Sequence, residues 1–236
     1  RRLGFRTMDV AIIGGTGAEG FGLALRLGAA GHHVTIGSRD AQRGAASAAD
    51  ARERVRGSAR IDGTTNEEAV RGAELVVVTV PFGGQAEIYR GLAPHLRPGQ
   101  IVLDATSPLA TAVGGRAWQV VRPWHGSAAE QAKALLPEGV RIVAGLHTIA
   151  ADALQHLDRP IESDVLLSGS DAAAKATVGG LIEQIPNLRW VDCGELSSAR
   201  IAETLTALLI SINRAYKVKD SGFRIQGHDT WGTPGG

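Results

Sequence analysis

The sequence predicts an α/β fold in which a doubly wound, mainly parallel sheet is followed by a smaller C-terminal α/β domain. Short apolar runs alternate with longer amphipathic stretches along the 236 residues, a pattern typical of parallel strands joined by crossover helices. Several runs are apolar at nearly every position, as expected when helices cover both faces of a sheet. A cluster of glycines separates the first apolar run from the first amphipathic stretch.

Six strands and three helices are identified before residue 159. The strands are the runs DVAIIGG, HHVTIGSR, ARIDGT, ELVVVTVPF, QIVLDATSP and VRIVAGLHTI. The helices are GFGLALRLGAAG, which Gly31 closes, AQRGAASAADARERVRG, and NEEAVRGA with Asn66 as its N-cap. Residues 8–158 are therefore expected to form one domain.

Residues 159–227 are expected to form the smaller domain. It contains SDVLLSGS, DAAAKATVGGLIEQI and LRWVDCG as a second βαβ unit, then ELSSARIAETLTALLISINRAY, the longest expected helix. Ser197 or Ser198 is expected to cap that helix. Its apolar positions recur at helical spacing: Ile201, Leu205, Leu208, Leu209 and Ile212. Because this apolar surface exceeds what a small domain covers, we expect a homodimer. Residues 1–7 and 228–236 are expected to be mobile tails.

The composition limits the function classes open to this chain. The apolar fraction of 44% can build a core, while the formal net charge of +1 argues against a nucleic-acid binder, which usually concentrates basic charge. No apolar run reaches the roughly 18 to 20 residues of a membrane helix. The single cysteine, Cys193, excludes an internal disulfide and a multi-cysteine metal site. We expect a cytoplasmic protein with small-molecule partners, no membrane contact and no metal.

The glycine cluster has the spacing G-x-G-x-x-G at Gly15, Gly17 and Gly20, directly after a strand and before a helix. In that context the glycines permit a tight turn, close approach of a pyrophosphate, and close packing of helix on strand. The helix N-terminus adds N–H donors and partial positive charge. This predicts a Rossmann-type dinucleotide site. Its expected pyrophosphate donors are the backbone amides of Thr16, Gly17, Ala18 and Glu19, with the carboxylate of the last pointing away.

The tip of the second strand selects between two dinucleotides. An acid about 20 residues past the loop binds the ribose hydroxyls of NAD, whereas an arginine nearby accommodates the 2′-phosphate of NADP. Here the tip carries Ser38 and Arg39, with Arg43 one helical turn later. A guanidinium group can donate two hydrogen bonds to one phosphate and stays charged. The nearest acid, Asp40, lies past the tip, so NADP is the predicted dinucleotide.

Three loops at the carboxyl ends of strands are expected to line the nicotinamide pocket: TVPFGG, DATSPL and LHTIAA. Pro81 and Pro108 would stiffen two of them. His147 and Thr148 are the only polar pair in this set able to donate to a second ligand, while Asp104 is expected to hold a loop amide or to act as an acid or base. No nucleophile with a paired base is visible. Hydride transfer between two rings needs mainly stacking and exclusion of water, so no catalytic side chain is predicted.

The stretches VAIIGGTGAEGFGLALRLGAAGHHVTIGSR, VVVTVPF, AGLHTIAA and YKVKDSGFRI together resemble the NADPH:coenzyme F420 oxidoreductases, reductases that pass a hydride between NADP and a deazaflavin. The resemblance covers about residues 8–227. It implies that the glycine loop holds the pyrophosphate, and that Ser38, Arg39 and Arg43 hold the 2′-phosphate. It places Val80, Gly84 and Ala151 along the nicotinamide, where the loop sequence itself already suggests Pro81. It implies that His147 and the stretch near Ser221 face the deazaflavin, and Thr148, the polar residue beside His147, is expected to bind there with them.

Two other functions stay open on the sequence alone. One is an NADPH-dependent imine or carbonyl reductase, with His147, Asp104 or Tyr216 as the proton donor, although the sequence after residue 159 is short and strand-containing for the large helical domain of such enzymes. The other is a non-catalytic NADP sensor. Membrane ferric reductases carry a similar domain, but this chain lacks their membrane helices. A basic cluster either attracts the acidic tail of the deazaflavin or is a solvated helix end: Arg214, Lys217, Lys219 and Arg224.

Overall fold

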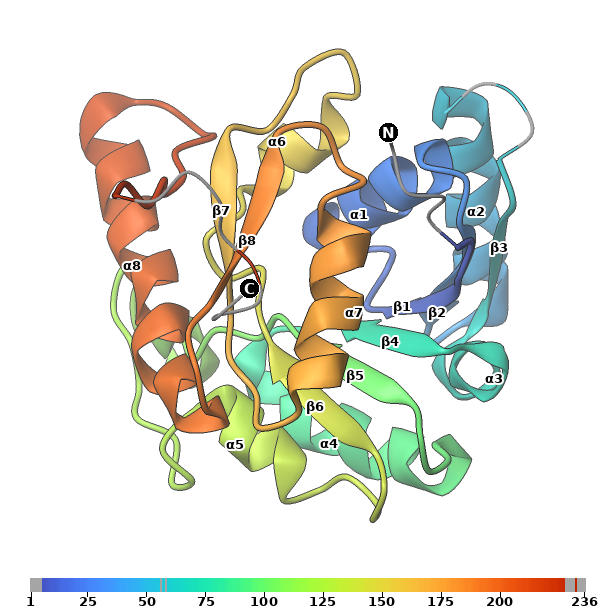
Figure 1. The fold of residues 1–236 in the computed structure, drawn as a ribbon, viewed down its shortest axis with the longest axis horizontal. Coiled ribbons are helices and arrows are strands. Elements are labelled where there is room, and N and C mark those ends of the chain that lie inside the picture. The colour runs from blue at the N-terminus through green and yellow to red at the C-terminus, as the bar shows by residue number, and fades with distance from the viewer. Residues whose placement is uncertain (1–5, 56, 58, 228–231, 233–236) are drawn as a thin grey trace.

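Two parallel sheets organise the computed structural model, which describes residues 6–55, 57, 59–227 and 232 (Figure 1). The larger sheet has the strand order β3-β2-β1-β4-β5-β6. Its strands are β1 Asp9–Ile13, β2 His33–Ser38, β3 Ile61–Thr65, β4 Leu75–Val78, β5 Ile101–Asp104 and β6 Arg141–Ala144. The chain reverses direction across the sheet between β3 and β4, so a crevice opens at the carboxyl ends of β1 and β4. This arrangement confirms the predicted fold class.

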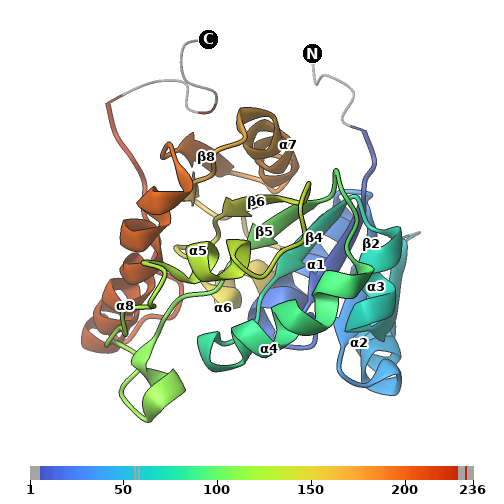
Figure 2. The same ribbon diagram turned by 90° about the horizontal axis from the view of Figure 1, so that it is seen from below.

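The helices are α1 Ala18–Ala29, α2 Ala41–Val55, α3 Asn66–Gly72, α4 Phe82–Leu92, α5 Ala128–Lys133, α6 Ala151–Gln155, α7 Ala172–Ile182 and α8 Ala199–Tyr216. Three short 3₁₀ turns span Ala93–His95, Ala110–Val113 and Leu196–Ser198. Figure 2 shows α3, α4 and α5 on one face of the large sheet and α1 and α6 on the other. The sheet is therefore the middle layer of three.

The strand β1 shows why its sequence is apolar at nearly every position. Val10 and Ile12 belong to the core on the α1 and α2 side, whereas Ala11 and Ile13 belong to the core on the α3 and α4 side. Successive side chains of a strand point to opposite faces, and all four of these are at most 1% exposed. A strand buried on both faces needs apolar residues throughout.

The smaller sheet pairs β7 Ser163–Leu167 with β8 Leu188–Asp192 in parallel, with α7 as the crossover. Its first strand continues from the edge of the large sheet, because Ala144 and Ser168 exchange backbone hydrogen bonds of 2.8 and 3.0 Å. The helix α8 follows and is the longest described, with 18 residues. The proposed domain division at residue 158 stays a prediction. Most of the proposed mobile tails, residues 1–5, 228–231 and 233–236, lie outside the described residues.

Two predicted helix caps are wrong. The N-cap of α3 is Thr65, whose Oγ1 accepts a hydrogen bond of 3.3 Å from the Glu68 N–H, so Asn66 is the first helical residue and its side chain is available for another use. Ser198 precedes α8 but makes no side-chain cap bond. It closes a 3₁₀ turn with helical dihedral angles, whereas a capping side chain needs an extended backbone. Gly31 closes α1 as predicted, with φ of +93°.

Among the described residues, none of the helices combines the length and the hydropathy that crossing a membrane requires. Nor does any group of three or more His, Cys, Asp or Glu side chains in that part of the chain lie close enough to hold a metal ion.

Candidate active site

The glycine loop packs tightly against the end of β4. Gly14 has a φ of +76°, and a Cβ atom there would lie 2.9 Å from the Thr79 carbonyl oxygen. A Cβ on Gly20 would lie 2.6 Å from Thr79 Oγ1 and 2.7 Å from the Gly15 Cα. Gly17 is different, since it is exposed and a Cβ there would meet only the Gly14 oxygen, at 3.2 Å. The loop is therefore closed towards the sheet and open at Gly17, the shape of a cradle for a ligand.

The backbone amides of this cradle face outward in the first turn of α1. The Phe21 N–H donates to the Gly17 oxygen at 2.8 Å, so the amides of Ala18 and Glu19 precede the first hydrogen bond of the helix and have no partner within it. The Gly17 N–H instead donates to the Gly14 oxygen at 2.9 Å. Of the predicted pyrophosphate donors, Gly17 thus has its amide engaged inside the loop.

Glu19 is half-buried, and its carboxyl group does not line the cavity above the loop. Burial, and then the nearby Asp104 carboxylate, raise the pKa of Glu19 to about 8. The side chain is therefore largely protonated at neutral pH. Glu19 therefore adds little negative charge next to the predicted pyrophosphate site, and its side chain does not repel a diphosphate bound there.

A cavity of about 560 Å³ lies at the carboxyl ends of β1, β2 and β4. It gathers eight of the predicted cofactor residues, namely Thr16, Gly17, Ser38, Arg39, Arg43, Val80, Pro81 and Gly84. Gly15, Ala18, Glu19 and Gly20 belong to the loop beneath it. Ala151 does not line the cavity. It opens α6, a helix that lies beside α1, where the Gln155 side chain donates to the Ala18 oxygen at 3.1 Å.

The tip of β2 supplies the charge of this cavity. The Asp40 carboxylate accepts the N–H groups of Gln42 and Arg43 at 2.7 and 3.1 Å, so it caps α2. Arg39 and Arg43 are exposed, and within the described part of the chain neither guanidinium forms an ion pair. The buried Ser38 hydroxyl accepts the Asp40 N–H at 3.3 Å. Two free positive charges and a hydroxyl thus converge at the position where a 2′-phosphate is expected.

Thr148 and Ser221 meet at a second cavity of about 220 Å³. Thr148 Oγ1 donates to the Asp164 carbonyl oxygen at 3.0 Å, and the Ser221 hydroxyl is buried without a hydrogen-bond partner. His147, in contrast, lines neither cavity. Its ring is 6% exposed, neither ring nitrogen has a partner, and burial lowers its pKa to about 4. The role of His147 towards a second ligand stays a prediction.

Asp104 is enclosed at the end of β5. Its carboxylate accepts the Thr106 N–H at 2.9 Å, the Tyr89 hydroxyl at 2.6 Å and the Gln85 amide at 3.0 Å. Burial raises its pKa to about 6, against the effect of these hydrogen bonds. Asp104 therefore holds a loop amide and lines neither cavity. Tyr216, the other acid considered, is exposed on α8.

Comparisons with known proteins agree with this geometry. The sequence profile of the family described as NADP oxidoreductase coenzyme F420-dependent matches residues 9–108. The F420-dependent NADP reductase of Methanothermobacter thermautotrophicus is 38% identical over 220 residues, which cover 92% of this chain and 94% of that protein. The chain belongs to the family of F420-dependent NADP reductases.

Two further relatives of the F420-dependent NADP reductase family extend over nearly the whole chain. The enzyme of that name from Methanocaldococcus jannaschii is 38% identical over 221 residues, covering 92% of this chain and 98% of its own. The crystal structure of a proposed F420-dependent NADP reductase from Arthrobacter sp. FB24 superposes with a TM-score of 0.79 at 28% identity, covering 93% of this chain and all of that one. The similarity therefore includes the C-terminal unit that contributes Ser221.

Sequence reasoning missed several residues around the site of this F420-dependent NADP reductase family member. Gly14 shapes the glycine cradle against Thr79, a residue of the predicted loop TVPFGG. The doubled glycine at Gly14 and Gly15 is the signal in the sequence that could have indicated Gly14. Asn66 lines the larger cavity, with its Oδ1 buried and without a partner, and its place directly after a strand could have indicated it. Asp164 had no such signal, because nothing in the strand SDVLL shows that its acid is buried.

Proposed function

We propose that this protein transfers a hydride directly between NADP(H) and the deazaflavin coenzyme F420. One observation carries the proposal. The cavity at the crevice between β1 and β4 joins the glycine cradle to two unpaired arginines, in a chain whose relatives are named F420-dependent NADP reductases. When bound, the nicotinamide and deazaflavin rings supply the redox chemistry themselves.

The residues of the cradle bind and orient NADP(H). The amides of Thr16, Ala18 and Glu19 would donate to the pyrophosphate, helped by the partial positive charge at the start of α1. Arg39 and Arg43 would hold the 2′-phosphate, with the Ser38 hydroxyl as a further donor. These contacts fix the dinucleotide at its phosphate groups, so its nicotinamide end is directed along the carboxyl edge of the sheet.

The walls of the site exclude water where the two rings meet. Val80, Pro81 and Gly84 line the larger cavity beyond the cradle, and small or apolar groups there leave room for a flat ring. We place Ala151 on the same path. Ser221 would donate to the deazaflavin from the second cavity. The Thr148 hydroxyl already donates its proton to the Asp164 carbonyl oxygen, so it would accept a hydrogen bond there. We also place His147 towards that ring. Holding two rings in contact supplies much of the rate by orientation alone.

The test uses the purified protein with NADPH and oxidised coenzyme F420. We expect the visible absorption of the deazaflavin to fall at a rate proportional to enzyme concentration, and to recover when reduced F420 is mixed with NADP. Heat-inactivated protein is the control. The absence of an enzyme-dependent change overturns the proposal. Consumption of NADPH with an imine or carbonyl compound in place of F420 would favour the alternative reductase, and tight NADP binding without turnover would favour a sensor.

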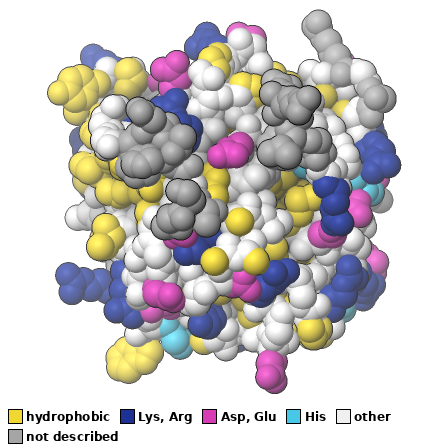
Figure 3. All heavy atoms as spheres, viewed as in Figure 1, with side chains coloured by type: hydrophobic (Ala, Val, Ile, Leu, Met, Phe, Trp, Pro, Cys, Tyr) yellow, Lys and Arg dark blue, Asp and Glu magenta, His cyan; other side chains and the backbone are white. Residues whose placement is uncertain are grey.

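We also propose that the protein is a homodimer formed through α8. Ile201 is 72% and Leu208 49% exposed, and Figure 3 shows apolar side chains gathered at the edge of the molecule where α8 lies. Trp124 and Val113, in the segment before α5, are exposed as well. Exposed apolar groups of this size on one side of a protein typically mark an interface. Light scattering should give the mass of two chains, and Ile201→Glu with Leu208→Glu should give one.

The partners proposed for the site itself are the two diffusible cofactors. The absence of a nucleic-acid partner is supported by the near balance of 25 basic and 24 acidic residues. A cytoplasmic location is supported by the single cysteine, which fits a reducing compartment.

A further inference from the structure

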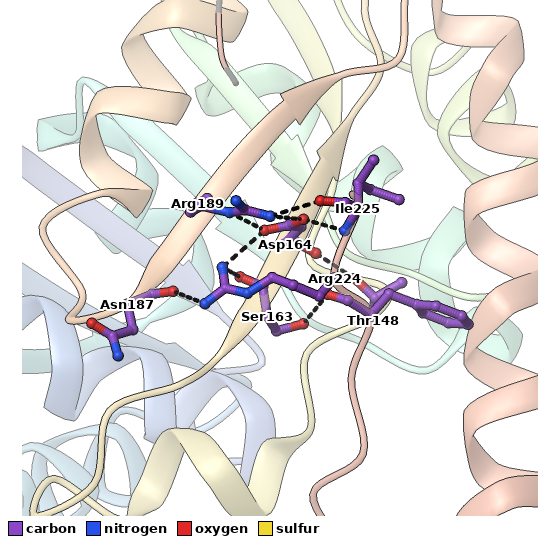
Figure 4. Close-up of polar contacts among 8 residues, drawn as sticks. Thr148, Ser163, Asp164, Asn187, Arg189, Arg224 and Ile225 are labelled. Carbon is purple, nitrogen blue, oxygen red and sulfur yellow. Dashed lines mark hydrogen bonds and ion pairs between the residues drawn. The ribbon is translucent and has the colours of Figure 1, made fainter. Parts of the chain in front are cut away.

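Asp164, the second residue of β7, joins three segments that are distant in sequence (Figure 4). Its backbone N–H donates to the Phe223 oxygen at 2.8 Å, and its carbonyl oxygen accepts from Thr148 Oγ1 at 3.0 Å. Its carboxylate receives side chains from β8 and from the chain beyond α8. One residue thus contacts the loop after β6, the neighbouring strand and the C-terminal segment, residues 220–225.

The Asp164 carboxylate is fully buried and accepts four hydrogen bonds. Arg189 donates two of them, from Nε at 2.7 Å and from a terminal nitrogen at 2.6 Å. Arg224 donates one at 3.0 Å, and the Ile225 N–H donates the fourth at 2.6 Å. A carboxylate has about four acceptor positions, so the group is saturated and no position is left for a ligand.

The charge of Asp164 is stabilised where it lies. Burial by itself would raise the pKa of this carboxyl group, but the hydrogen bonds from Arg189, the Ile225 N–H and Arg224 outweigh burial and lower the pKa below its usual value. The group is therefore ionised at neutral pH. Removing one partner from a buried, paired charge is strongly unfavourable, so these contacts act as a unit.

The C-terminal segment has no helix or strand of its own and depends on these contacts. The Phe223 oxygen also accepts from Ser163 Oγ at 3.1 Å, and Arg224 donates to the carbonyl oxygens of Ser163 and Asn187 at 3.3 and 3.1 Å. Gly222 lies so close to β7 that a Cβ atom would be 2.6 Å from Ser163 Oγ. The segment is held along β7 mainly by side chains around Asp164.

The same contacts shape the second cavity. Its walls include Thr148 from the loop after β6, Ser163 from β7, and Ser221 with Gly222 from the C-terminal segment. Thr148 is bound to the Asp164 carbonyl oxygen, and Ser221 lies three residues before Arg224, which is bound to the Asp164 carboxylate. The buried Ser221 hydroxyl has no partner in the protein. Asp164 thus positions Thr148 directly and Ser221 through Arg224. The Ser221 N–H is held in addition by Asn213 Oδ1 at 3.3 Å.

We infer that Asp164, held by Arg189 and Arg224, is a positioning residue that fixes the C-terminal segment as the wall of the coenzyme F420 subsite. The inference rests on the proposed function, because it concerns the second substrate of that reaction. Asp164 does not touch the substrate and acts through Thr148 and Ser221. It also changes the interpretation of the predicted basic cluster, because the Arg224 guanidinium is occupied by Asp164 and is not free for an acidic tail.

The test compares Asp164→Asn and Arg224→Gln with the wild type. Both variants should raise KM for F420 at least tenfold and leave KM for NADPH within twofold, because no hydrogen bond of Asp164 or Arg224 reaches the glycine loop or the tip of β2. The matched control is Asp192→Asn. Asp192 ends β8 of the same small sheet and pairs with the buried Lys175 of α7 at 2.6 Å. It makes no bond to the C-terminal segment, so the KM of this variant for F420 should stay within twofold of the wild type.

A second measurement is independent of activity. Trypsin cleaves after arginine, and in the wild type the Arg224 side chain is bound and the chain around it is held on β7. Mass spectrometry should show cleavage after Arg224 at least ten times faster in Asp164→Asn than in the wild type or in Asp192→Asn. Arg224→Gln, which leaves Asp164 bound by Arg189, provides the kinetic test if Asp164→Asn does not fold.

Three results would overturn the inference. They are an unchanged KM for F420 in the folded variants, an equal rise in both KM values, or equal protection of Arg224 in Asp164→Asn. A wild-type enzyme that does not reduce F420 would instead overturn the proposed function, while the cleavage rates would still decide whether Asp164 holds the segment.

Discussion

At the residue scale, we propose that the two guanidinium groups at the tip of β2 select which dinucleotide binds. The carboxylate of Asp40, which follows this tip, accepts the first N–H groups of α2, so its charge is partly balanced by the helix start. Arg39→Ala should weaken NADPH binding by about 1.5 to 3 kcal/mol, the range for a hydrogen bond to a charged group, and should leave NADH binding unchanged. Calorimetric titration with each dinucleotide measures both affinities.

The control for Arg39→Ala is Arg60→Ala, which removes an exposed arginine. Arg60 precedes β3 and so lies at the amino-terminal ends of the strands, whereas Arg39 follows the carboxyl end of β2. It should leave the affinity for NADPH unchanged. An equal loss of NADPH and NADH affinity in Arg39→Ala would show that this side chain holds a part that both dinucleotides share.

Gly20 tests the cradle at the same scale. A Cβ atom there would lie within 3 Å of Thr79 Oγ1, the Gly15 Cα and the Gly14 oxygen, so Gly20→Ala must push the loop away from β4. Overpacking of this kind costs about 1 to 3 kcal/mol, and NADPH affinity should fall as the amides move. Urea denaturation and dinucleotide titration measure the two effects.

Gly180→Ala is the matched control for Gly20→Ala. Gly180 lies inside α7, and a Cβ there meets nothing within 4 Å. Because alanine is the better helix former, this variant should be more stable by about 0.5 to 1 kcal/mol and should bind NADPH as the wild type does. A Gly20→Ala protein with wild-type affinity would contradict the packing argument.

At the element scale, α6 depends on a side chain of α1. The helix has only five residues, too few to be stable alone. Arg26 of α1 is 4% exposed and donates to carbonyl oxygens in and just after α6: Leu154 at 3.0 Å, Ala153 at 2.8 Å and Arg159 at 2.9 Å. One guanidinium group thus satisfies the carbonyl groups that a helix end leaves free.

Arg26→Met should therefore lower the free energy of unfolding by about 2 to 4 kcal/mol, because the stem is replaced but several buried carbonyl groups lose their donor. Equilibrium urea denaturation measures the loss. Arg54→Met removes an exposed arginine paired with Asp50, and should change stability by less than about 0.5 kcal/mol. A similar loss in the free energy of unfolding for both variants would mean that the buried hydrogen bonds of Arg26 contribute no more to stability than the exposed ion pair of Arg54.

The helices that the sequence did not reveal share this dependence on distant residues. The sequence TVPFGG predicts a loop, yet α4 begins at Phe82, directly after Pro81, which suits a helix start, and the two glycines are tolerated in its first turn. The short helices α5 and α6 have no detectable periodicity. They are stabilised by Glu203 and Arg26, which lie 75 and 128 positions away from their partners Ala128 and Leu154. Strands and long helices were predictable because their patterns are local.

The candidate site likewise contains residues that the sequence predicts and residues that it does not. The glycine loop and the tip of β2 could be predicted, since each is a short motif whose chemistry follows from neighbouring residues. The Asp164 contacts could not, because they join residues about 60 positions apart. Thr148 is indicated by its polar place beside His147 and Ser221 by the family resemblance, and only the fold shows that they share a cavity.

At the scale of the whole molecule, Glu203 connects α8 to the helix α5 on the large sheet. Its carboxyl oxygens accept the N–H groups of Ala128 and Ala129 at 2.8 and 3.0 Å, and the side chain is fully buried. Burial raises the pKa of Glu203 to about 8. The two N–H groups oppose the shift, and the nearby acids Asp104 and Glu130 add to it. The connection between the two parts of the chain therefore carries a proton at neutral pH.

This proton makes stability depend on pH. In the unfolded chain the carboxyl group titrates near 4.5, so the folded state binds more protons and its stability decreases as the pH rises towards 8. Between about pH 6.5 and 8, the free energy of unfolding should fall by about 1 to 2 kcal/mol from this group, given roughly 1.4 kcal/mol per unit for one proton. Glu19, with a pKa also raised to about 8, acts in the same direction.

Urea denaturation at several pH values in that window measures the slope, and Glu203→Gln is the decisive variant. A glutamine cannot ionise, so the decrease should become shallower while the contribution of Glu19 remains. The variant also loses one N–H acceptor of α5, which lowers stability equally at every pH and does not affect the slope. Glu53→Gln, at an exposed acid of α2, should keep the wild-type slope. A slope unchanged in Glu203→Gln would mean that the buried connection between α8 and α5 is ionised at neutral pH.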